Sequence, residues 1–94
     1  MKESIVTILI NEYDYSEYVA EVTANDLLNI QPQLQSALKA WLDTHAITNV
    51  EIEGFSVKQF MERGYTFPSA LISLDWLLTE PDVAKAELTD ELRR

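Results

Sequence analysis

Two segments near the start of the chain have the residue pattern of β-strands. Residues 4–10 are β-branched and apolar on both faces of a pleat, which is typical of a strand buried on both sides. Residues 17, 19 and 21 then alternate with residues 18, 20 and 22, which predicts a returning strand after a turn at Asn11–Tyr15. The apolar residues from Tyr15 to Val22 also have helical spacing. The second segment is therefore compatible with a strand or a helix, and we predict the strand, which gives a β-hairpin.

The middle of the chain predicts a helix and then a third strand. Pro32 suits a first helical turn, where its missing amide would be unpaired in any case. An apolar stripe with a period of 3.6 residues follows it. Its members are Leu34, Ala37, Leu38, Trp41, Leu42 and His45. Val50–Glu53 alternates again and predicts a strand that ends at Gly54.

Further helices are predicted from Ser56 onward. Ser56 and Gln59 have the spacing of a capping box, and Phe55 and Phe60 that of the accompanying hydrophobic staple. Gly64 supplies a left-handed cap that keeps this helix short. The next helix runs from Pro68 to about Thr79, and a final one begins near Pro81.

The resulting order is ββαβααα. We therefore predict a single α+β domain over residues 1–94, in which an N-terminal β-hairpin and one further strand form a three-stranded sheet packed by three to four helices. The size is that of one ordinary domain, and 47% of the residues are apolar, which is ample for a core without disulfides or metal.

The net charge of −9 limits the classes of molecule that the protein is expected to bind. The chain has sixteen Asp and Glu residues and only seven Lys and Arg residues, which are spread along the sequence. Direct binding to nucleic acid or to an anionic membrane is therefore disfavoured. A protein with a basic surface is the expected partner. The apolar runs are far shorter than the roughly 20 residues of a membrane span. With no cysteine in the chain, this favours a cytoplasmic protein.

No arrangement of residues predicts catalysis, a cofactor or a metal ion. The chain has one histidine, no cysteine, and neither a P-loop nor a nucleophile elbow. His45 falls at the end of its helix, where a histidine commonly caps carbonyl groups. Glu12, Asp14 and Glu17 offer hard oxygen ligands but lack the central glycine of a calcium loop. We therefore expect a protein that is not an enzyme.

The candidate functional residues are aromatic and acidic. The stretch from Glu12 to Glu21 contains three tyrosines and no positive charge, and tyrosines among carboxylates suit an interface with a basic partner. Trp76 projects toward the polar arc of its helix, where it is either an interface residue or covered by the last helix. The residues predicted to form the interface are Tyr13, Asp14, Tyr15, Glu17, Tyr18 and Trp76.

Asp75 lies on the apolar side of the predicted Pro68–Thr79 helix. A carboxylate there is costly unless it is paired or hydrogen-bonded. We expect a structural aspartate that binds a tyrosine hydroxyl, a loop amide or Arg63. The alternative is an acid with a perturbed pKa in a pocket.

Two resemblances involve the helices around Gly64. Residues Ser56–Leu78 resemble a helix-turn-helix motif, but the helix in the recognition position, Pro68–Trp76, has no Arg or Lys for bases or phosphates. Residues Val57–Tyr65, with the later Trp76–Leu78, resemble a ubiquitin-associated-type three-helix module through the aromatic residue after Gly64. Arg63 departs from the apolar residue expected before that glycine, and no function is transferred.

Three functions follow from these observations. The leading hypothesis is a non-enzymatic interaction module, a small regulator or adaptor. The second is an acidic mimic of nucleic acid that inhibits a DNA- or RNA-binding protein, because Glu51 and Glu53 on one strand would lie about 6.6 Å apart, near the spacing of phosphates. The third is a structural homodimer that pairs through the apolar Pro68–Thr79 helix.

Overall fold

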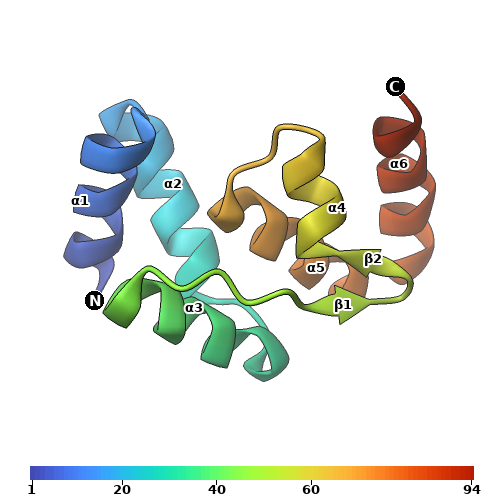
Figure 1. Ribbon diagram of the computed structural model, residues 1–94, viewed down its shortest axis with the longest axis horizontal. Helices are drawn as coiled ribbons and strands as arrows, with labels where there is room; N and C mark the ends of the chain where they lie inside the picture. The colour runs from blue at the N-terminus through green and yellow to red at the C-terminus, as the bar shows by residue number, and fades with distance from the viewer.

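The computed structural model describes all 94 residues, and the chain forms six helices and one small sheet (Figure 1). Helices account for 73% of the residues. The helices are α1 (Lys2–Tyr13), α2 (Glu17–Leu28), α3 (Pro32–Thr44), α4 (Val57–Glu62), α5 (Phe67–Thr79) and α6 (Pro81–Arg93), and the strands are β1 (Glu51–Ile52) and β2 (Phe55–Ser56).

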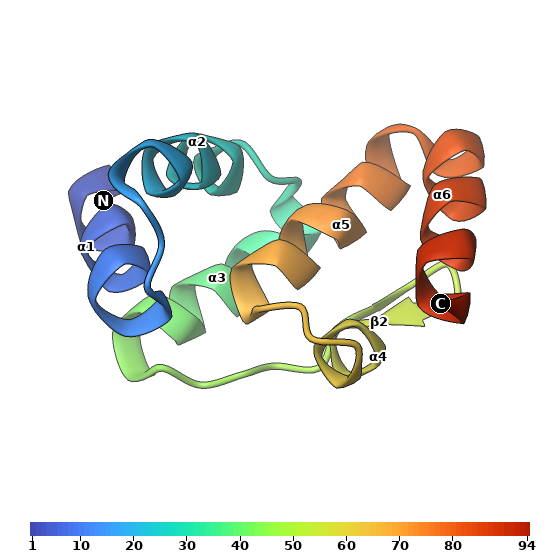
Figure 2. The same ribbon diagram turned by 90° about the horizontal axis from the view of Figure 1, so that it is seen from above.

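Helix α5 is the central element. It runs through the middle of the molecule, with the α1–α2 pair on one side and α6 on the other (Figure 2). Its sequence explains this position, because it contains no charged residue except Asp75. A helix that is apolar around most of its circumference needs neighbours on several sides. The side chains of α5 that are buried are Phe67, Pro68, Ala70, Leu71, Leu74 and Leu77.

The predicted N-terminal β-hairpin is wrong, because both segments are helices. Ile5 and Leu9 are fully buried at a spacing of four residues, and Ala20, Ala24 and Leu27 are fully buried at spacings of four and three in α2. The two helices pack against each other, so tertiary burial decides the structure over the β-preference of the branched side chains. The order ββαβααα is therefore incorrect.

The turn predicted at Asn11–Tyr15 is only partly right, because Asn11–Tyr13 belong to α1 and the connection to α2 begins at Asp14. Asp14 adopts the left-handed conformation, with φ 59°, which an Asp tolerates better than most residues. Ser16 then begins α2, since its side chain accepts a hydrogen bond from the Val19 amide.

The predicted three-stranded sheet is also wrong, and a two-stranded hairpin takes its place. Glu51 pairs with Ser56 and Ile52 with Phe55, in antiparallel register. The connecting residues, Glu53 and Gly54, both have positive φ, at 53° and 83°, as a tight type I′ hairpin requires. The partner of the predicted strand is thus the segment directly after Gly54.

The helices predicted from Pro32 onward are confirmed. Helix α3 begins at Pro32, and its buried side chains come from the predicted stripe. Ser56 and Gln59 form both hydrogen bonds of a capping box at the start of α4, and the rings of Phe55 and Phe60 stack with centroids 6.1 Å apart. None of the helices is long and apolar enough to cross a membrane.

Candidate interaction surface

Tyr13 is part of the internal structure. Its hydroxyl accepts a hydrogen bond of 3.1 Å from the Trp41 indole N–H, and the two rings meet edge to face at 5.8 Å between centroids. Trp41 itself is 1% exposed. Tyr13 therefore joins α1 to α3 and gives the largest buried side chain a partner for its polar atom.

Tyr15 joins the α1–α2 connection to the start of α5. Its hydroxyl lies 2.9 Å from Thr66 Oγ1 and 3.3 Å from Ser69 Oγ. Thr66 is the N-cap of α5 and accepts the Ser69 amide. The tyrosine thus completes a network of hydroxyl groups at a helix end, which is a structural role.

The acidic residues around these tyrosines are dispersed over the surface. Glu12 Oε1 lies 3.3 Å from His45 Nδ1, and both side chains are about half exposed. Asp14 ends α1. Glu17 lies exposed in the first turn of α2, where its negative charge interacts favourably with the helix dipole. His45 caps α3 through its backbone, because its amide donates to the Trp41 carbonyl.

Tyr18 differs from the other two tyrosines of the stretch. Its side chain is 77% exposed and makes no hydrogen bond within the chain. Val19 and Val22 lie beside it on the same side of α2 and are 47% and 43% exposed. Three exposed apolar side chains within five residues are unusual on a helix that already buries its opposite face.

Trp76 is half-buried and lines an open pocket between α2 and α5. The pocket has a volume of about 290 Å³. Its lining comes from the ends of both helices: Asp26, Asn29, Ile72, Asp75, Trp76 and Thr79. Val19 and Val22 precede Asp26 at helical spacing and so continue this side of α2 toward its start. We call Tyr18, Val19, Val22, Asp26, Ile72, Asp75 and Trp76 the α2–α5 surface.

Asp75 has the structural role that the sequence predicts. Its Oδ1 accepts a hydrogen bond of 2.8 Å from the Gln31 amide, in the connection between α2 and α3. A loop amide is therefore its partner, and the carboxylate is half-buried rather than enclosed. It holds α5 to that connection and keeps a negative charge at the α2–α5 surface.

The α2–α5 surface is negatively charged because both helices lack cations. No Lys or Arg occurs in residues 3–38 or in residues 64–84. The same stretches supply carboxylates on α2 and α5 or within three residues of their ends: Glu17, Glu21, Asp26, Asp75, Glu80 and Asp82. One of these, Glu21, is neutralised by Lys2 at 2.9 Å. The rest leave a negative field around the exposed apolar side chains.

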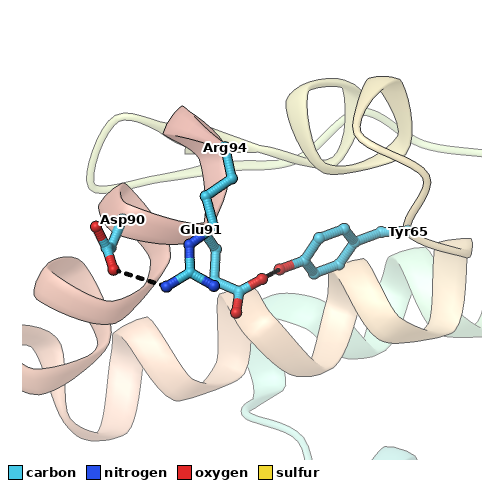
Figure 3. Close-up of polar contacts among 4 residues, drawn as sticks. All are labelled: Tyr65, Asp90, Glu91 and Arg94. Atoms are coloured by element: carbon cyan, nitrogen blue, oxygen red, sulfur yellow. Dashed lines mark hydrogen bonds and ion pairs between the residues drawn. The ribbon is translucent and has the colours of Figure 1, made fainter.

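A polar contact on the other side of α5 attaches the last helix. The Tyr65 hydroxyl donates to Glu91 Oε2 at 3.4 Å, and Arg94 next to it pairs with Asp90 at 3.3 Å (Figure 3). Partial burial and the negative charge of Glu91 raise the pKa of Tyr65 above its usual value. This contact attaches α6 to the segment before α5.

The arrangement offers binding contacts and no catalytic constellation. The structure gathers no group of three His, Asp or Glu residues that could hold a metal ion. His45 has one carboxylate beside it and no nucleophile. Of the predicted interface, Tyr18 and Trp76 reach the α2–α5 surface, and Glu17 lies one residue before it. Tyr13 and Tyr15 are partly buried and hydrogen-bonded to other parts of the chain, and Asp14 ends the preceding helix.

Sequence analysis missed the apolar residues that complete the surface. Val19, Val22 and Ile72 were not among the candidates, although the helical spacing from Tyr15 to Val22 was the available signal. Comparisons with protein-family models, curated proteins and solved structures gave no match, which leaves the chain's own residues as the basis for a functional proposal.

Proposed function

We propose that this protein is a non-enzymatic interaction module that binds a protein with a basic surface through the α2–α5 surface. The observation that carries the proposal is the row of exposed apolar residues on α2 next to the Trp76 pocket, on two helices without a single cation. Exposed apolar groups inside a charged rim are typical of protein interfaces.

The two parts of this surface have different roles in binding. Tyr18 and Trp76 are the side-chain types that contribute most when they become buried between proteins. The carboxylates around them accelerate the approach of a cationic partner and disfavour acidic ones. We therefore expect the affinity to depend on the aromatic residues and the association rate to depend on salt.

The other two functions find less support among the same residues. The spacing argument for a nucleic-acid mimic used Glu51 and Glu53, but Glu53 lies in the turn and pairs with Lys85 at 3.0 Å. The homodimer hypothesis used the apolar face of α5, and most of that face is buried inside the chain. The interaction module is therefore the function that we propose.

Site-specific photocrosslinking tests the proposal in the cells that express the protein. A benzophenone amino acid replaces Val22 on the α2–α5 surface or, as a matched control, Glu87 on the exposed side of α6. We expect an adduct from position 22 alone. The purified partner should bind with at least ten-fold lower affinity to the Tyr18→Ala variant and more weakly in high salt.

Three results would contradict the proposal. One is the absence of any adduct at position 22, and another is equal crosslinking at position 87. The third is a partner whose affinity for the protein is unchanged by the Tyr18→Ala substitution and by the salt concentration. Circular dichroism of the Tyr18→Ala variant checks that its fold is intact, which the 77% exposure of this side chain leads us to expect.

A further inference from the structure

The connection from α3 to β1 is an extended chain with unpaired main-chain groups. It crosses the molecule at the edge opposite to α2 (Figure 2). The main chain of residues 46–49 makes no hydrogen bond within the protein. The residues are exposed at the surface, so the N–H and C=O groups of alternate residues along one edge are available to a second strand.

The sheet stops here because its second strand becomes a helix. Val50 continues β1 backward and accepts a hydrogen bond of 3.0 Å from the Val57 amide. The next pairing position is taken by the Asn49 side chain, whose Oδ1 accepts the Lys58 amide at 3.0 Å. Helix α4 thus begins where β2 would have continued, and the strand-like segment before Val50 has no neighbouring strand.

The space left beside this segment is an open, apolar pocket of about 430 Å³. Ile47, Val57 and Met61 line it, and Ile47 is 50% exposed. Ile47 and Asn49 both face the pocket, as side chains two residues apart do on an extended chain. One wall of the pocket is therefore formed by side chains of the extended segment, next to its unpaired edge, and the other wall is α4.

Two charges on α4 complete the lining. Lys58 and Glu62 are four residues apart and both line the pocket, and neither takes part in an ion pair. A ligand that covers the apolar wall would place a carboxylate near Lys58 and a cation near Glu62. Charge complementarity thus favours a segment with an apolar residue between an acidic and a basic one.

We infer that residues 46–49 and α4 bind an extended segment of another protein by β-strand addition, with one apolar side chain in the pocket. Main-chain hydrogen bonds to the unpaired edge would supply affinity, and the pocket with Lys58 and Glu62 would supply selectivity. A helical ligand does not fit this inference, because its own main-chain groups are already paired. The site is separate from the α2–α5 surface, so either can exist without the other.

A random nonapeptide library displayed on phage and selected against the full chain tests the inference. We expect enriched peptides with an alternating apolar pattern and flanking acidic and basic residues. Bound synthetic peptide should protect alternate amides within residues 46–49 from hydrogen exchange. N-methylation of alternate peptide amides should lower the affinity at least ten-fold, because it removes the donors that pair with the edge.

Matched variants locate the binding. Ile47→Lys should abolish it, whereas Val83→Lys, which alters an exposed apolar residue on α6, should leave it unchanged. Tyr18→Ala should also leave it unchanged, which separates this site from the α2–α5 surface. Failure to enrich any peptide, binding that tolerates N-methylation, or equal binding to Ile47→Lys would overturn the inference. A dimer of the protein that protects the same amides would overturn it too.

Discussion

Tyr15 and Tyr18 are three residues apart in one acidic stretch, yet they lie in opposite environments. The hydroxyl of Tyr15 contacts Thr66 and Ser69, whereas Tyr18 is 77% exposed and contacts none. Tyr13 resembles Tyr15, because it holds the indole of Trp41. The difference arises at the turn after Asp14. Tyr13 and Tyr15, which precede Ser16, bind residues of α3 and of the start of α5, whereas Tyr18 lies on the outer side of α2. Tyrosines that look equivalent in the sequence thus divide into structural and accessible groups.

The sharpest test of this division is the loss of Trp41, the buried side chain that Tyr13 holds. Trp41→Ala should lower the free energy of unfolding by about 3–5 kcal/mol, through lost burial and the cavity that it leaves. Urea unfolding measured by circular dichroism reports the change. Tyr18→Ala should stay within about 0.5 kcal/mol of the parent protein. Comparable losses in both variants would show that Tyr18 also belongs to the core.

A smaller change compares the hydroxyl groups themselves. Tyr15→Phe removes a hydroxyl with two partners and should cost about 1 kcal/mol. Thr66 and Ser69 still bind each other at 3.0 Å, which limits the loss. Tyr18→Phe should have no measurable effect on unfolding. Equal stabilities of the two variants would contradict the structural role of Tyr15.

The errors in the predicted fold come from segments whose local pattern fits two structures. In residues 4–10 the branched side chains satisfy a buried strand, but Thr7 is exposed while Ile5 and Leu9 are fully buried. The burial of Ile5 and Leu9 depends on α2, which covers one side of this segment, and the local pattern does not show that contact. From Pro32 onward, prolines, Gly64 and the Ser56–Gln59 box set the helix ends locally, and these helices were predicted correctly.

The candidate surface was predictable only where it depended on residue type. Aromatic character drew attention to Tyr18 and Trp76, and both reach the α2–α5 surface. The pattern offered no way to separate them from Tyr13, because its partner Trp41 lies 28 residues further along the chain. The unpaired edge at residues 46–49 was not predictable from the sequence for a similar reason. It is exposed because β2 ends at Ser56, where α4 begins.

The smallest expected effect concerns Tyr65, whose hydroxyl is bonded to a charged partner where that of Tyr15 is bonded to neutral ones. Partial burial, and then the Glu91 carboxylate, raise the pKa of Tyr65, so the folded state favours the protonated phenol. This contribution to stability is complete below the pKa of an unfolded tyrosine, about 10. It is lost as the pH rises through the higher pKa of the folded state.

Unfolding by urea at pH 8 and at pH 11 measures this contribution. The stability difference between the parent protein and Tyr65→Phe should shrink or reverse at pH 11, since phenylalanine has no proton to lose and the other three tyrosines are common to both proteins. Glu91→Gln should weaken the pH dependence without abolishing it, because burial is the larger cause of the raised pKa. A difference that is the same at both pH values would show that Tyr65 stays protonated or that its contact with α6 contributes nothing. In the second case α6 would be held by Ala84 and Leu88, the two side chains that it buries in the core, and by the ion pair of Lys85 with Glu53.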